Sequence, residues 1–186
     1  MNLSSEIAGL FARRGTGSYF GERVSMLEHA LQAAHFARAE DAPPALVVAA
    51  LLHDIGHLLE KVPDDINDWH VDARHEAVGS AWLAQYFGPR VWEPVALHVA
   101  AKRYLCATDP AYHRRLSPAS VLTLGLQGGA MAADEVRAFE ARPFFRDAVR
   151  VRHWDDQGKI GGFRAPGLDE YLAMIESVRL PAGAAR

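Results

Sequence analysis

Residues 45–57 of the chain read ALVVAALLHDIGH. The first eight of these residues are apolar on every side of a helix, which predicts a central, buried helix over residues 45–59. A charged carboxylate in such a helix is costly unless it is paired, hydrogen-bonded or bound to a metal ion. Asp54, with His53 beside it and His57 one helical turn after His53, therefore indicates a buried polar site at the centre of the fold.

The rest of the chain has apolar residues at helical spacing and almost no strand signal. Glycine and proline separate further helices, which are predicted at residues 7–13, 25–40, 74–87, 91–105, 117–126, 134–141, 143–153 and 168–178. Residues 63–72 are expected to form a polar loop and residues 181–186 a frayed end. Because the connections are short and leave no domain boundary, the sequence predicts one compact, all-α domain over residues 1–186.

The composition of the 186 residues excludes several classes of protein. With 49% hydrophobic and 23% charged residues, the chain is too apolar to be disordered. A formal net charge of −3 provides no basic surface for nucleic acid or an anionic membrane, and we find neither a secretory signal nor a membrane span. The single cysteine, Cys106, excludes a disulfide framework and fits a small buried side chain. We therefore expect a cytoplasmic protein, a monomer or weak homo-oligomer, that acts on a small molecule.

Histidines and aspartates on separate predicted helices carry the chemistry. Any single histidine is more often a core or surface residue than a metal ligand. Four further residues, however, stand among apolar neighbours and can join His53 and Asp54: His29, His75, His98 and Asp155. A carboxylate has two oxygens, so Asp54 could bridge two cations, and four histidines with two aspartates suit a pair of first-row transition-metal ions. The remaining histidines, which we leave out of this set, are His35, His70, His113 and His153.

The order His … His-Asp … His … His … Asp resembles the HD-domain superfamily, which is all-helical and consists mostly of metal-dependent phosphohydrolases. Five sequence blocks resemble, more specifically, the PhnZ-type diiron oxygenases that degrade organophosphonates. These blocks are Ser18-Tyr-Phe-Gly-Glu22, His75-Glu-Ala-Val-Gly79, His98-Val-Ala-Ala-Lys-Arg-Tyr-Leu105, Leu126-Gln-Gly-Gly-Ala-Met131 and Trp154-Asp-Asp-Gln-Gly-Lys159. They follow the family's order over residues 18–159, with Ala130 as a departure where the family has proline.

The resemblance implies two iron ions, as a mixed-valent Fe(II)/Fe(III) pair, with O2 as co-substrate. Carried over by position, the ligands of the first iron would be His29, His53, Asp54 and Asp155. Those of the second would be Asp54, His75 and His98, so that Asp54 is the bridge. Asp155 is preferred because it stands at the family position four residues before Lys159, and Asp156 remains the alternative.

By the same resemblance, the phosphonate and hydroxyl groups of a substrate would contact His57, Lys102, Ser120, Gln127 and Arg152. The loop with Tyr19 and Glu22 would meet the amine end of the substrate and approach the second iron. We expect the catalytic residues to be Tyr19, Glu22, His57 and Lys102.

Charge and spacing support an anionic substrate independently of the resemblance. An Fe(II)/Fe(III) pair with two carboxylates has a net charge of about +3, which favours a dianion. Lys102 lies four residues after His98 and should share its helical face. The competing interpretations are a surface position for Lys102 and for Arg152, a helix start at Ser120, a turn at Gln127, and a surface loop at residues 18–22.

The leading hypothesis is an oxygenase that cleaves the carbon–phosphorus bond of a 1-hydroxy-2-aminoethylphosphonate and releases phosphate. A free amine would give glycine and a trimethylated amine glycine betaine. The trimethylated form would need aromatic faces, for which Phe20, Trp69 and Tyr112 are candidates. The alternatives are an HD-domain phosphohydrolase acting on a nucleotide or other phosphate ester, and a helical signalling module without activity.

Overall fold

The computed structural model of the chain describes residues 2–59 and 74–181. Its helices are α1 (Leu3–Arg14), α2 (Met26–Ala39), α3 (Pro44–Leu52), α4 (Ile55–Leu59), α5 (His75–Leu83), α6 (Pro89–Thr108), the short 3-10 helix η2 (His113–Arg115), α7 (Pro118–Leu126), α8 (Ala133–Glu140), α9 (Phe145–Gln157) and α10 (Asp169–Ser177). In these residues the only β structure is two isolated bridges, so the expected all-α class is confirmed.

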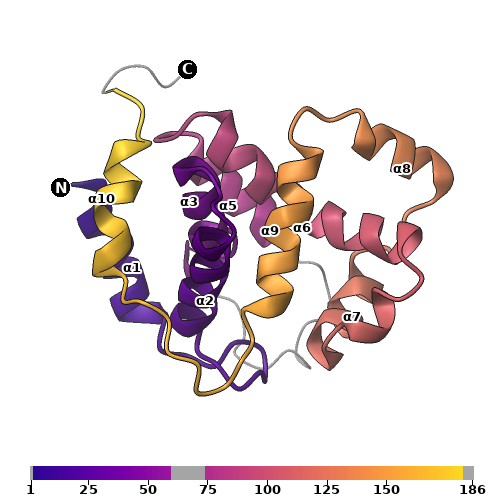
Figure 1. The fold of residues 1–186 in the computed structure, drawn as a ribbon, viewed down its shortest axis with the longest axis horizontal. Helices are drawn as coiled ribbons and strands as arrows, with labels where there is room; N and C mark the ends of the chain where they lie inside the picture. Colours follow the sequence, from indigo (N-terminus) through magenta and orange to yellow (C-terminus); the bar gives the residue numbers. More distant parts are fainter. Residues whose placement is uncertain (1, 60–73, 182–186) are drawn as a thin grey trace.

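Helix α3 forms the centre of the molecule, with α2, α6, α9 and α10 packed around it (Figure 1). Every residue from Leu46 to Leu52 is buried, and burial stabilises each large aliphatic side chain by about 1.5–3 kcal/mol. Helices α1 and α10 cover one side of this core, while α7 and α8 lie on the other (Figure 1). The all-apolar pattern of α3 thus makes it the element around which the site is built.

The predicted single helix over residues 45–59 is wrong in one respect, because it is interrupted at His53 and Asp54. Helix α3 ends at Leu52 and α4 begins at Ile55, with a turn between them. The interruption allows α4 to approach α5 closely at Gly56, where an added Cβ would lie 2.0 Å from the carbonyl oxygen of His75. This close approach brings the start of α5, and with it His75, to the Asp54 turn.

Two other expectations about single residues need correction. Asp155 lies within α9, which continues to Gln157 instead of ending near His153. Cys106 is half-buried, not buried, because it faces outward near the exposed end of α6. The predicted loop at residues 63–72, with Trp69 and His70, and residues 182–186 of the predicted frayed end lie outside the described residues.

Polar contacts hold the chain after α9 against α2. The Gln32 side chain donates to the carbonyl oxygen of Ile160 at 3.0 Å and accepts from its backbone N–H at 3.0 Å. One turn earlier on α2, His29 Nδ1 is 2.9 Å from the carbonyl oxygen of Gly158. These contacts fix α2 and the end of α9 relative to each other.

In the described part of the chain, no helix combines the length and apolar character needed to cross a membrane.

Candidate functional site

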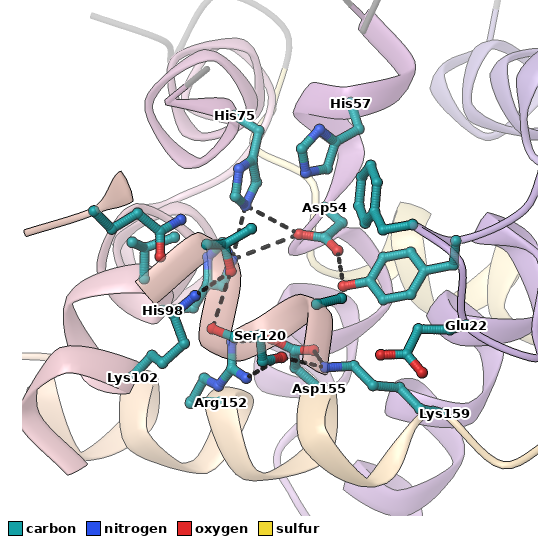
Figure 2. A pocket seen from close by; sticks show the side chains of 16 residues that line it. Glu22, Asp54, His57, His75, His98, Lys102, Ser120, Arg152, Asp155 and Lys159 are labelled. Atoms are coloured by element: carbon teal, nitrogen blue, oxygen red, sulfur yellow. Dashed lines mark hydrogen bonds and ion pairs between the residues drawn. The ribbon is translucent and has the colours of Figure 1, made fainter. Parts of the chain in front are cut away.

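The two oxygens of Asp54 face two different pairs of histidines. Oδ2 lies 3.3 Å from Nε2 of His53 and 3.6 Å from Nε2 of His29. Oδ1 lies 3.2 Å from Nε2 of His75 and 3.5 Å from Nε2 of His98. All five side chains are buried. One carboxylate at the turn between α3 and α4 therefore joins ligand groups from α2, α5 and α6. Figure 2 shows Asp54 with His75 and His98.

Within each pair, the two Nε2 atoms lie 3.1 Å apart. Three of the four rings direct Nδ1 to a backbone carbonyl: His29 to Gly158 at 2.9 Å, His53 to Ala50 at 2.8 Å and His98 to Val95 at 2.7 Å. In a neutral ring, an Nδ1–H that donates to a carbonyl leaves Nε2 without a proton, which is the usual state of a metal-binding histidine. On each side of Asp54, two Nε2 atoms lie next to a carboxylate oxygen and can form a metal-binding group with it.

Asp155 completes the first of these groups. Its Oδ1 lies 3.5 Å from Nε2 of His29 and 3.9 Å from Nε2 of His53. Asp156, one residue later on α9, instead binds Arg152 and Tyr112. The geometry therefore favours Asp155 over Asp156 as the ligand.

Burial and neighbouring charges set the protonation of these groups. Burial raises the pKa of the Asp54 carboxyl, but the charge of His53 and its hydrogen bond to Asp54 outweigh burial and hold that pKa well below its usual range. Burial lowers the pKa of His29 to about 4, and it also lowers that of His98, so both rings are neutral. Burial opposes a charge on His53, yet Asp54 raises the pKa of that ring to about 9. Metal binding would displace the His53 proton, because a ligating histidine is neutral.

The donor set fits two transition-metal ions. Four imidazole nitrogens and two carboxylates suit iron, zinc or manganese, whereas magnesium and calcium favour oxygen ligands alone. The six residues expected from the sequence as ligands thus lie together, with Asp54 in the bridging place.

Beside this centre is a pocket with a cationic wall (Figure 2). The side chains of Lys102, Ser120 and Arg152 are buried, so the surface interpretations of Lys102 and Arg152 are wrong. Lys102 Nζ donates to Thr123 Oγ1 at 2.8 Å, and Lys159 Nζ donates to Ser120 Oγ at 3.1 Å. Ser120 follows the helix cap of α7, which is Ser117, and its hydroxyl faces the cations.

Gln127 lies at the predicted turn and also beside the pocket. It ends α7 as the C-cap residue, and it also lines the pocket. Its Oε1 atom is buried and has no hydrogen-bond partner among the described residues. His57 lines the pocket as well, with its ring stacked on His75 at a centroid distance of 4.0 Å.

Tyr19, Phe20 and Glu22 of the loop at residues 18–22 line the pocket, whereas Ser18 and Gly21 are exposed. The Tyr19 hydroxyl donates to Asp54 Oδ2 at 2.8 Å, and its ring stacks on His29 at 3.8 Å. This places Tyr19 on the His29 side of Asp54, whereas we expected it near the second metal. Burial and the charge of Asp54 raise the pKa of Tyr19 well above its usual range, so the phenol keeps its proton.

Glu22 reaches the pocket from the end of this loop (Figure 2). Its Oε1 atom is buried and accepts no hydrogen bond from any residue that the structure describes. Phe20 also lines the pocket, as expected of an aromatic face, and its φ of 48° lies in the left-handed region. Tyr112 does not line it, so the structure contradicts that candidate.

Two residues near the site, Lys159 and Thr123, were not identified from the sequence as site residues. Lys159 lies just past the end of α9 and forms an ion pair with Asp155 Oδ1 at 3.2 Å, and the spacing of four residues could have indicated this contact. Thr123 lies one turn after Ser120, which could have indicated a shared face. Asp156, named from the sequence only as the alternative metal ligand, lies four residues after Arg152, and this spacing could likewise have indicated their contact. Of the excluded histidines, His113 is exposed and His35 and His153 are half-buried, away from the metal-binding groups.

Comparisons with known proteins agree with this geometry. The model of the HD domain matches residues 26–138. The chain is 47% identical over 161 residues to the hydroxymethylphosphonate dioxygenase of Gimesia maris, covering 86% of this chain and 80% of that protein. It is 42% identical over 175 residues to the [1-hydroxy-2-(trimethylamino)ethyl]phosphonate dioxygenase (glycine-betaine-forming) of Leisingera caerulea, covering 94% and 89%. An uncharacterized protein of Acanthamoeba polyphaga mimivirus is 35% identical over 171 residues.

Proposed function

The chain belongs to the HD-domain family, and from that premise we propose that it is a diiron dioxygenase that cleaves the carbon–phosphorus bond of a 1-hydroxyphosphonate. The observation that supports this function best is that one pocket joins a two-sided His/Asp centre to a wall of lysine and arginine side chains. In the reaction, the carbon that bears the hydroxyl becomes a carboxyl carbon and phosphorus leaves as phosphate. One molecule of O2 supplies the two oxygen atoms by which the carboxylate and phosphate products together exceed the 1-hydroxyphosphonate.

Two irons would be held by the residues around Asp54. His29, His53, Asp54 and Asp155 would bind the first, while Asp54, His75 and His98 would bind the second. When bound as a mixed-valent pair, iron supplies the one-electron chemistry that reactions of O2 require. The second iron has fewer protein ligands, which leaves more of its positions for exchangeable groups.

The cationic wall would bind the phosphonate. Lys102 forms no ion pair with a carboxylate in the described residues, and burial, together with the nearby charge of Arg152, lowers its pKa to about 7. A dianionic phosphonate would provide the missing counter-charge. Ser120 already accepts a hydrogen bond from Lys159, so its hydroxyl can donate to a phosphonate oxygen.

His57 would act on the substrate hydroxyl. Burial and the neighbouring His75 hold the pKa of the His57 ring well below its usual range, so the ring is neutral. A neutral imidazole can accept a proton from a hydroxyl group or orient it through a hydrogen bond.

Glu22 supports a substrate with a cationic group at its other end. A buried carboxylate oxygen without a partner is costly, and an ammonium group would satisfy it. The rings of Tyr19 and Phe20 beside it could also face a quaternary ammonium. We therefore propose a 1-hydroxy-2-aminoethylphosphonate, with a free or trimethylated amine, in preference to hydroxymethylphosphonate.

The test is phosphate release by the iron-reconstituted protein with each of the three hydroxyphosphonates, in air and under argon. We expect release only in air, and faster with an amine-bearing compound. Low-temperature EPR of the same samples should show a mixed-valent diiron signal that changes with the preferred substrate. Release of phosphate from a phosphate ester under argon, without this signal, would instead support a phosphohydrolase.

A further inference from the structure

Behind the cationic wall, Arg152 is bound by Tyr112 and Asp156, two residues to which the proposed function assigns no role. Its Nε lies 2.9 Å from the Tyr112 hydroxyl and 3.2 Å from Asp156 Oδ2. Its Nη2 contacts Asp156 Oδ1, and the Tyr112 hydroxyl also bonds to Asp156. On the other side, Arg152 Nη1 lies 2.7 Å from Asp155 Oδ2. The guanidinium is therefore bound along one edge by a Tyr–Asp pair.

Tyr112 and Asp156 lie on the side of Arg152 away from the pocket. Neither residue lines the pocket beside Asp54, whereas Arg152 does. Both line a second cavity instead, together with Arg115 and His153. Tyr112 reaches the pocket through its hydrogen bond to Arg152, whereas Asp156 also lies 3.8 Å from the Nζ atom of Lys159, which lines the pocket as well. Tyr112 is therefore the residue whose effect on a ligand should pass through Arg152.

The hydrogen bonds leave part of the guanidinium available. Of its five N–H groups, Nε–H is taken by Tyr112 and Asp156, one on Nη2 by Asp156 and one on Nη1 by Asp155. The second N–H of Nη2 makes a long hydrogen bond of 3.5 Å to Ser120 Oγ at the pocket, which a phosphonate oxygen could replace, and one N–H remains on Nη1. Two N–H groups on one guanidinium are what bidentate binding of a phosphonate requires.

Tyr112 also ties a separate segment to α9. It lies between the end of α6 at Thr108 and the start of α7 at Pro118, and its buried ring places the hydroxyl against α9. Burial raises the pKa of the Tyr112 hydroxyl above its usual range, so it keeps its proton, donates it to Asp156 and accepts from Arg152. The Tyr112–Asp156 pair thus fixes the position of Arg152 together with that of the segment that leads from α6 to α7 and Ser120.

We propose that Tyr112 and Asp156 are positioning residues that hold the Arg152 guanidinium in place to bind the phosphonate group. This inference rests on the proposed function, since it requires that Arg152 contacts a phosphonate.

The test measures binding of methylphosphonate, which has no hydroxyl group to be oxidised, by calorimetry on the iron-loaded protein. We expect Tyr112→Phe to weaken binding about tenfold, the effect of losing roughly one hydrogen bond's free energy. Tyr104→Phe is the matched control, because it removes a Tyr–carboxylate hydrogen bond to Glu140 at an exposed site. Asp156→Asn should weaken binding in the same direction. With substrate, Tyr112→Phe should raise KM more than it lowers kcat.

The decisive step repeats Tyr112→Phe in an Arg152→Lys background. If the hydroxyl acts through the guanidinium, its effect on methylphosphonate affinity should disappear there. Unchanged affinity in Tyr112→Phe, an undiminished effect in the Arg152→Lys background, or loss of iron or of thermal stability in Tyr112→Phe would overturn the inference. Should the unaltered protein bind no phosphonate, the proposed function itself would fail.

Discussion

Replacing Asp54 with alanine should remove both metal ions at once. The structure shows why: one oxygen of this carboxylate faces His29 and His53, and the other faces His75 and His98. By contrast, His98→Ala should remove only the second ion, because His29, His53, Asp54 and Asp155 remain around the first. The expected iron contents are therefore zero and one per chain, against two in the unaltered protein.

The size of the effect follows from the number of ligands. Structural four-ligand metal sites bind with about 10–16 kcal/mol, so one ligand contributes roughly 2.5–4 kcal/mol. That free energy corresponds to an affinity about 10²–10³-fold lower for each ion. Asp54→Ala applies this loss to both sites, and it also removes one of the two carboxylates that offset the charge of the metals.

The assay is iron content after anaerobic dialysis against a fixed concentration of free Fe(II), with circular dichroism to verify that the variants are folded. Asp134→Ala, which removes an exposed carboxylate from α8, is the control and should keep two irons. Two irons in Asp54→Ala would refute the bridging role, and one iron would show that Asp54 serves a single site.

Three further predictions concern the pocket and its support. Glu22→Gln should raise KM for amine-bearing hydroxyphosphonates by roughly 10–100-fold and change that for hydroxymethylphosphonate little, because only the former carry a cation; equal effects on both would contradict a contact with the amine. Burial lowers the pKa of Lys102 to about 7 in the folded chain, whereas in the unfolded chain the lysine keeps its ordinary pKa of about 10. Between pH 7 and 10 only the unfolded chain binds this proton, so the metal-free protein should become more stable as pH rises through this range. Chemical denaturation should therefore show Lys102→Met to be more stable by on the order of 3 kcal/mol below pH 7, with the difference vanishing near pH 10. Gly56→Ala should destabilise the fold by about 3 kcal/mol or more, because its Cβ would lie 2.0 Å from the His75 carbonyl oxygen. Gly125→Ala, which has open space around it, is the control and should not lower the melting temperature.

The buried polar cluster around Asp54 could be predicted because the position of this carboxylate conflicts with ordinary helix chemistry. Asp54 follows eight apolar residues and His53, and a charge in that place requires a partner. The interruption of the helix at His53 could not be predicted in the same way. It depends on the contact between Gly56 and α5, which joins residues far apart along the chain, and local helical pattern carries no information about it.

Periodicity also could not choose between Asp155 and Asp156. Adjacent residues on a helix point about 100° apart, so the choice depends on how α9 is rotated against its neighbours. The contact between His29 and Gly158 fixes that rotation, with an added Cβ at Gly158 only 3.2 Å from His29 Nδ1. From the sequence, Tyr112 is only a candidate aromatic face for a trimethylated amine. In the structure its hydroxyl bonds to Arg152 and Asp156, and the residue does not line the pocket.

Four charged residues in the last turns of α9 and just past its end would connect metal binding to anion binding. They are Arg152, Asp155, Asp156 and Lys159, and Lys159 lies beyond the helix, which ends at Gln157. Asp155 faces the first metal group with Oδ1 and forms its ion pair with Arg152 through Oδ2. A metal ion bound through Oδ1 would draw electron density from this carboxylate and weaken its ion pair with Arg152, so that more of the guanidinium would be available to a phosphonate. By linkage, a bound phosphonate would then favour metal binding to the same degree.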